Sequence, residues 1–92
     1  MIIQQKVRFH GNIQGIGFRY RVKQRAQALG IVGWIKNDPN QTVRAVFCGE
    51  HDRVQKILEE IPLMSGIVIE KTDIKNEPVQ SWNEFKIEYD RA

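Results

Sequence analysis

The chain has 92 residues, of which 41% are hydrophobic and 27% are charged, and its formal net charge is +3. This length suits one globular domain with a single core and excludes a second domain, and apolar stretches of only a few residues exclude a bilayer-spanning helix. The single cysteine, Cys48, excludes an internal disulfide, and with two histidines it does not form a zinc-ligand pattern. We therefore expect one domain over residues 1–92 that works without a metal or a cofactor.

An alternating strand and an amphipathic helix open the chain. Val7 and Phe9 alternate with polar side chains, which is the period of a half-buried strand, and we expect Gly11 to end it. A glycine-punctuated loop follows. Apolar residues then recur at helical spacing, at Phe18, Val22, Ala26 and Leu29. Gly30 stands where a glycine commonly closes a helix, so the helix is predicted to end there.

The remaining chain is predicted to supply a second helix and four more strands. Strands are expected over residues 31–36, 42–48, 67–74 and 85–89, and the second helix over residues 54–61. The turn at residues 37–41 joins two of these strands into a hairpin, and Pro62 ends the helix. The order β-α-β-β-α-β with a short extra strand indicates the ferredoxin-like α+β sandwich, in which two helices cover one face of an antiparallel sheet.

Basic residues dominate the first part of the chain. Residues 1–37 contain no Asp or Glu and seven Lys or Arg, whereas residues 38–92 contain seven basic and eleven acidic side chains. A positive segment of this kind attracts phosphate, nucleic acid or an acidic protein surface, although the charge alone fits a solvated face equally well. Residues 1–5 lack the apolar run of a signal peptide, so we expect a soluble cytoplasmic protein with no membrane partner.

The predicted topology brings three parts of the chain to one edge of the sheet. In a β-α-β crossover, the loop after the first strand, the start of the helix and the end of the second strand lie close together. Those places hold Gly15, Gly17, Arg19 and Asn37. Glycines let successive backbone N–H groups point inward beside a helix N-terminus, which suits an anion. A guanidinium in the first helical turn is unfavourable beside the helix dipole unless an anion shares the site.

Two motifs that contain these residues resemble the motifs of a known family. Residues 11–19, G-N-I-Q-G-I-G-F-R, resemble the acylphosphatase signature G-x-[VI]-Q-G-[VI]-x-F-R, and residues 33–37, G-W-I-K-N, resemble its second motif, G-W-[VI]-[RK]-N. The spacing of the two motifs, the order of the elements and the ending F-K-I-E-Y at residues 85–89 also fit this family. The resemblance therefore covers nearly the whole chain.

The resemblance implies hydrolysis of an acyl phosphate to a carboxylate and inorganic phosphate. By analogy with the family, the catalytic residues would be Arg19 and Asn37, with Asn37 orienting the attacking water. The phosphate would be held by Arg19 and the backbone of the loop, namely Gln14, Gly15, Ile16, Gly17 and Phe18. The implied partner is a small acyl phosphate, or inorganic phosphate in the loop. We expect no metal, no cofactor, no nucleic-acid partner and a monomer.

The sequence departs from the family at the hairpin turn, where Asn40 and Gln41 replace the usual Asp-Gly. Gln41 lacks the glycine's ease at positive φ, so we expect a changed hairpin geometry or stability. Activity should be retained, because Asn37 precedes the change.

Two other functions remain open from the sequence. One is a catalytically silent module of the same fold that binds phosphate or has a regulatory role. The other is RNA binding, since residues 15–18 faintly resemble a motif of RNA-binding domains with this strand order. That motif belongs on an exposed strand, and the open sheet face is expected to carry basic residues without an aromatic ring. We therefore favour the enzyme.

Overall fold

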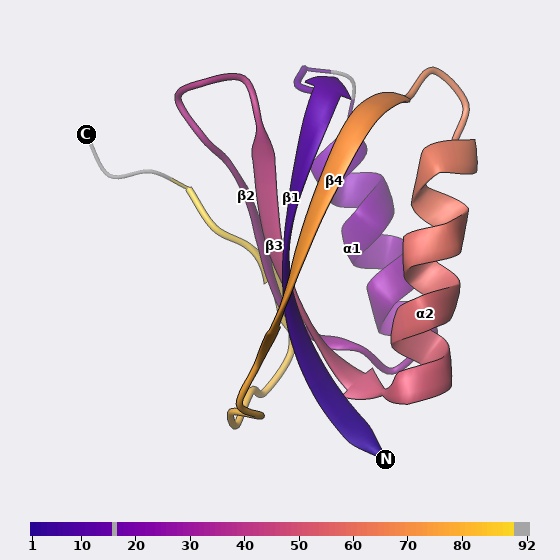
Figure 1. Cartoon of the computed structure of the whole chain (residues 1–92), viewed down its shortest axis with the longest axis vertical. Helices are drawn as coiled ribbons and strands as arrows, with labels where there is room; N and C mark the ends of the chain where they lie inside the picture. The colour runs from indigo at the N-terminus through magenta and orange to yellow at the C-terminus, as the bar shows by residue number, and fades with distance from the viewer. Residues whose placement is uncertain (16, 90–92) are drawn as a thin grey trace.

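A computed structural model of the chain describes residues 1–15 and 17–89 and contains five strands and two α-helices. The elements are β1 (Ile2–Asn12), α1 (Phe18–Ala28), β2 (Val32–Asn37), β3 (Val43–Glu50), α2 (His51–Glu60), the 3₁₀ turn η1 (Ile61–Leu63), β4 (Val68–Glu77) and β5 (Phe85–Ile87). Both helices lie on one side of a twisted sheet (Figure 1). The ferredoxin-like α+β fold is therefore confirmed, with one extra strand. Within the described residues, neither helix has the length and apolar character to cross a membrane.

The sheet has the strand order β4-β1-β3-β2-β5. The first four strands of this order pair antiparallel, as predicted, but β5 pairs parallel with β2, so the sheet is mixed rather than antiparallel. The direction of β5 follows from the path of the chain. β4 runs opposite to β2, and the chain reverses once after β4 before it reaches the free edge of β2.

The core lies between the sheet and the two helices. The predicted stripe on α1 is buried, and Phe18 packs edge-on against Phe9 of β1, with ring centroids 5.7 Å apart. The helix closes at Gly30 as predicted, since the Gly30 and Ile31 N–H groups donate to the carbonyls of Gln27 and Ala26. A bidentate ion pair between Arg25 and Glu60 then joins the two helices.

Gly11 does not end the first strand, which continues to Asn12. The pairing of β1 with β4 shifts register between His10 and Gly11, which is a β-bulge. A side chain at Gly11 would place its Cβ atom 1.9 Å from the carbonyl oxygen of Val68. The glycine is therefore required by the close approach of two strands and not by a turn.

Gln4 fastens the segment that links β4 to β5 onto the open face of the sheet. Its side chain is 2% exposed. The Gln4 oxygen accepts hydrogen bonds from the backbone N–H of Gln80 and the indole of Trp82, and its nitrogen donates to Glu77 and Gln80. All the hydrogen-bonding capacity of a buried amide is satisfied in this way. Cys48 is buried beneath the same segment, and burial raises the pKa of its thiol.

The hairpin turn keeps a left-handed residue although the usual glycine is missing. Gln41 has a φ of 70°. The Asp38 N–H donates to the Thr42 carbonyl and closes the hairpin, and Asn40 accepts a hydrogen bond from the Thr42 hydroxyl at 2.6 Å. The change in sequence therefore leaves the positive φ in place and puts a side chain into a conformation that costs about 1–2 kcal/mol for a residue other than glycine.

Replacing Gln41 with Gly is expected to raise the free energy of unfolding by about 0.5–1 kcal/mol. Relief of the left-handed strain outweighs the greater freedom that glycine has in the unfolded chain. Urea denaturation of the two proteins measures the difference, and Pro39→Gly, in the same turn, provides the control. A Q41G variant less stable than the parent would show that Gln41 makes a compensating contact.

Candidate active site

The loop between β1 and α1 is shaped by two glycines in the left-handed region. Gly15 has a φ of 79° and Gly17, the N-cap of α1, has a φ of 73°. A Cβ atom at either position would meet no heavy atom within 4 Å, so open space lies beside both. Among residues 1–15 and 17–89, no side chain caps α1, and its first turn contains no acidic residue. The first N–H groups of the helix are therefore available to an outside acceptor.

A cavity of about 220 Å³ lies beside this loop. Its lining residues come from the loop, the start of α1, the end of β2 and the C-terminal region: Ile13, Gly15, Gly17, Phe18, Arg19, Tyr20, Asn37, Ile87 and Tyr89. The guanidinium-bearing Arg19 and the carboxamide-bearing Asn37 thus line the same pocket, as the predicted topology requires. The Phe18 side chain is buried in the core, 2% exposed, so it is not available to a ligand in the pocket.

Arg19 is held by an aromatic ring. Its guanidinium carbon lies 5.2 Å from the centroid of the Tyr89 ring, which is the geometry of a cation–π contact. Within the described residues, Arg19 has no carboxylate partner at salt-bridge distance. The ring therefore orients the guanidinium without neutralising its charge, and the charge stays available to an anion.

Asn37 is the last residue of β2 and pairs with Val43 across the hairpin. Its side-chain oxygen is buried and accepts no hydrogen bond from any described residue. A buried acceptor without a donor costs about 1–3 kcal/mol, so its presence at a pocket wall suggests a partner that enters the pocket. Water is a donor of the right size and can also accept from the amide nitrogen.

The loop and the hairpin are tied together by the side chain of Gln14. Its nitrogen donates to the carbonyls of Asp38 at 3.1 Å and Thr42 at 2.9 Å. The Asp38 carboxylate, 8% exposed, accepts two hydrogen bonds from Arg44 and lies 3.6 Å from Arg8. These contacts fix the end of β2, which carries Asn37, against the loop that leads to Arg19.

Not all of the predicted site residues line the pocket. Gly15, Gly17, Phe18, Arg19 and Asn37 line the pocket. Gln14 is not among the lining residues and acts through its side chain as a brace, while Ile16 lies outside the described residues. Tyr20, Ile87 and Tyr89 also line the pocket, and the sequence did not predict them there. The spacing of residues 85, 87 and 89 indicated one face of a strand, but nothing in it indicated that this strand joins β2.

Replacing Gln14 with Ala is expected to lower the free energy of unfolding by about 1–3 kcal/mol, because the partly buried Asp38 carbonyl loses its donor and the Thr42 carbonyl loses one of two, keeping the Asp38 N–H. If Gln14 acts as a brace, the loss in kcat/KM should be smaller than the loss caused by removing Arg19. Urea denaturation and steady-state kinetics of Q14A measure both. Unchanged stability with a large loss of phosphate affinity would instead make Gln14 a ligand.

No group of three His, Cys, Asp or Glu side chains that could hold a metal ion occurs among residues 1–15 and 17–89. The pocket offers instead a guanidinium, backbone N–H groups and one amide. A ferredoxin-like domain with these groups in one pocket belongs to the class of small proteins suited to binding a phosphoryl group.

Comparison with known proteins identifies the family. The acylphosphatase family model matches residues 5–87. An acylphosphatase of Picrophilus torridus is 44% identical over 88% of this chain and 96% of its own length, and one of Thermoplasma volcanium is 35% identical over 95% and 98%. The structure of an acylphosphatase from Coxiella burnetii superposes with a TM-score of 0.89 at 25% identity, covering 95% of this chain and 93% of that one. This chain belongs to the acylphosphatase family, and its activity is the hydrolysis of acyl phosphates.

Proposed function

We propose that the protein hydrolyses acyl phosphates by holding the phosphoryl group between Arg19 and the glycine loop, with Asn37 orienting the attacking water. The observation that carries this proposal is that Arg19 on α1 and Asn37 on β2 line one pocket with Gly15 and Gly17. The two side chains approach the pocket from different elements. One can therefore hold the phosphoryl oxygens while the other faces a nucleophile.

The electrostatics of the pocket favour a phosphoryl dianion. The N–H groups of the loop and of the first turn of α1 carry partial positive charge, and Arg19 adds a planar fork that binds two oxygens at once. Negative charge spread over the phosphoryl oxygens in the transition state asks chiefly for such fixed donors. Arg19 also repels the helix N-terminus in the free protein, and a bound phosphate removes that repulsion.

The reaction needs few further groups. The water oxygen attacks phosphorus, the bond from phosphorus to the acyl oxygen breaks, and that oxygen leaves with the electron pair as a carboxylate. The conjugate acid of this leaving group has a pKa of about 4, so no general acid is needed. Asn37 cannot act as a base, and we assign the proton of the attacking water to a phosphoryl oxygen. We propose on this ground that hydrolysis needs no metal.

The rim of the pocket suits the acyl group. Tyr20, Ile87 and Tyr89 line the pocket, and Tyr20 and Tyr89 are exposed. Exposed aromatic rings beside hydrogen-bond donors fit a substrate with a hydrocarbon acyl end and a phosphate end. We also propose that the protein is active as a monomer.

Release of phosphate from benzoyl phosphate in the presence of a metal chelator tests the proposal. Wild type should hydrolyse the substrate at the same rate with and without EDTA, while the Arg19→Ala variant should be nearly inactive. Loss of the wild-type activity in EDTA would contradict the metal-free mechanism. Tight phosphate binding without hydrolysis would make the protein a silent phosphate-binding module.

A further inference from the structure

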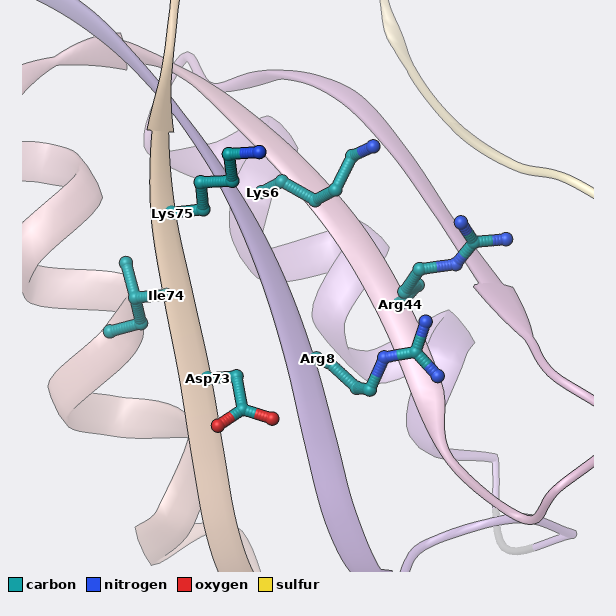
Figure 2. Close-up of a pocket in the computed structure, with 6 residues that line it drawn as sticks. All are labelled: Lys6, Arg8, Arg44, Asp73, Ile74 and Lys75. Atoms are coloured by element: carbon teal, nitrogen blue, oxygen red, sulfur yellow. The ribbon is translucent and has the colours of Figure 1, made fainter.

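The open face of the sheet, opposite the helices, carries a second and larger cavity. It has a volume of about 270 Å³ and is lined by Lys6, Arg8, Arg44, Asp73, Ile74 and Lys75 (Figure 2). The head groups of Lys6, Lys75, Arg8 and Arg44 extend over the same side of the sheet, whereas Ile74 points away from them. None of these residues lines the pocket of Arg19 and Asn37. This basic groove is therefore separate from the candidate active site.

The strand register arranges the cations of the basic groove in two rows. Lys6 lies directly opposite Lys75, and Arg8 lies directly opposite Arg44. Because the rows are two residues apart along β1, they are separated by about 7 Å. Like charges directly opposite each other destabilise a sheet unless something compensates them. An anion that spans both rows would supply that compensation.

The acidic neighbours only partly offset these four cations. Asp38 is shared by Arg44 and Arg8, and Glu77 lies 3.6 Å from Lys6. The groove carboxylate, Asp73, is itself 2.8 Å from His10 and 3.7 Å from Lys71. Lys75 forms no ion pair within the part of the chain that the structure describes. The groove thus keeps an excess of positive charge.

These cations also remain accessible to solvent. The side chains of Lys6, Arg8 and Arg44 are 39%, 35% and 28% exposed, so each can reach a ligand without a rearrangement of the sheet. The cavity lies on an open sheet surface that β4, β1 and β3 build together. Such a surface favours an extended ligand over a small enclosed one.

An aromatic ring continues one row of the groove. Trp34 of β2 pairs with Val46, which in turn pairs with Lys6. Its neighbours Gly33 and Ile35 are buried on the helix side, so Trp34 lies on the open face, with the Arg44 guanidinium 5.8 Å from its ring centroid. The expectation that this face has no aromatic ring is therefore wrong. This removes one of the two reasons given for excluding a nucleic-acid partner, whereas the position of residues 15–18 before a helix still argues against the RNA-binding motif itself.

We propose that the basic groove binds single-stranded nucleic acid, as a function separate from hydrolysis. The two rows of cations match a chain of phosphodiesters, and the Trp34–Arg44 pair offers a surface on which a base can stack. Duplex nucleic acid keeps its bases stacked inside and would not use this ring. The groove recognises the repeated phosphates together with an unpaired base. No preference for a nucleotide sequence is required.

Fluorescence anisotropy with a labelled 12-nucleotide oligonucleotide tests this proposal. The wild type should bind with a Kd of the order of 1–100 µM at 50 mM salt, and log K should fall with log salt with a slope of about −2 to −3 for three or four phosphate contacts. The Lys6→Gln/Lys75→Gln double variant should flatten that slope by about 1.4. Trp34→Leu should weaken binding at least about fivefold without changing the slope.

A matched control distinguishes binding by the basic groove from binding through the net positive charge of the protein. Lys23→Gln/Lys56→Gln removes the same charge from α1 and α2 on the opposite side of the sheet, and it should leave binding unchanged. Hydrolysis of benzoyl phosphate by the Lys6/Lys75 double variant should equal that of wild type, because neither residue lines the catalytic pocket. Absence of binding at 50 mM salt, equal loss in both double variants, or tighter binding of a duplex would each overturn the proposal.

Discussion

Replacing Arg19 with Ala is expected to lower kcat/KM for benzoyl phosphate by at least about 10²–10³. Loss of a single oxyanion donor has this effect in other enzymes, and Arg19 supplies two donors and a full charge. Phosphate, as a competitive inhibitor, should lose affinity in parallel, because the guanidinium binds the same oxygens in the ground state. Steady-state kinetics with and without phosphate measure both quantities.

The stability of this variant separates catalysis from folding. Removing Arg19 abolishes the contact with the Tyr89 ring but also removes a cation from the positive end of α1. These two effects oppose each other and each is below about 1 kcal/mol, so Tm should barely change. Arg19→Lys should recover only part of the activity, since an ammonium lacks the planar fork. Near-normal kinetics of the Ala variant would remove Arg19 from the mechanism.

The parts of the fold that repeat with a fixed period could be predicted from the sequence. The stripe from Phe18 to Leu29 recurs at helical spacing and is buried, and Gly30 closes its helix. The ends of strands, where they depend on contact with a partner strand, could not be predicted in this way. Gly11 reads locally as a strand end, yet it lies inside β1 because the backbone of β4 approaches it there.

The pairing of the last strand shows why long-range contacts escape local patterns. Residues 85–89 alternate, which indicates a strand but neither its neighbour nor its direction. The parallel register with β2 is set by the segment that Gln4 holds across the open face, through a buried amide that has no signature in the sequence. For this reason the contact of Tyr89 with Arg19 was not foreseen.

The candidate site was predictable where topology decides and unpredictable where side-chain packing decides. A β-α-β crossover brings Arg19 and Asn37 to one sheet edge whatever the details of packing. The role of Gln14 as a brace depends on the exact position of the hairpin carbonyls, which no motif encodes. Trp34 is a different case. Trp34 lies between Gly33 and Ile35, which are buried on the helix side. The two-residue alternation of a strand could therefore have placed its ring on the open face.

Replacing Asn37 with Ala is expected to lower kcat by at least about 10²-fold while phosphate inhibition changes less than about threefold. An unoriented water attacks far less often, and misplacement of a reacting group by about 1 Å can cost this much. The phosphate contacts assigned to Arg19 and the loop are left intact, so ground-state binding should persist. The comparison of kcat with the phosphate inhibition constant therefore distinguishes the two residues.

The burial of Asn37 adds an independent expectation for the same variant. Its side-chain oxygen is buried with no donor among the described residues, an arrangement that costs the folded protein free energy. Asn37→Ala should thus be at least as stable as wild type in urea denaturation even as its kcat falls. In that case the Asn37 side chain lowers the free energy of unfolding of the wild type, and its role is to position the attacking water. A variant that loses stability and keeps its kcat would show instead that Asn37 serves the hairpin, and the attacking water would need another partner.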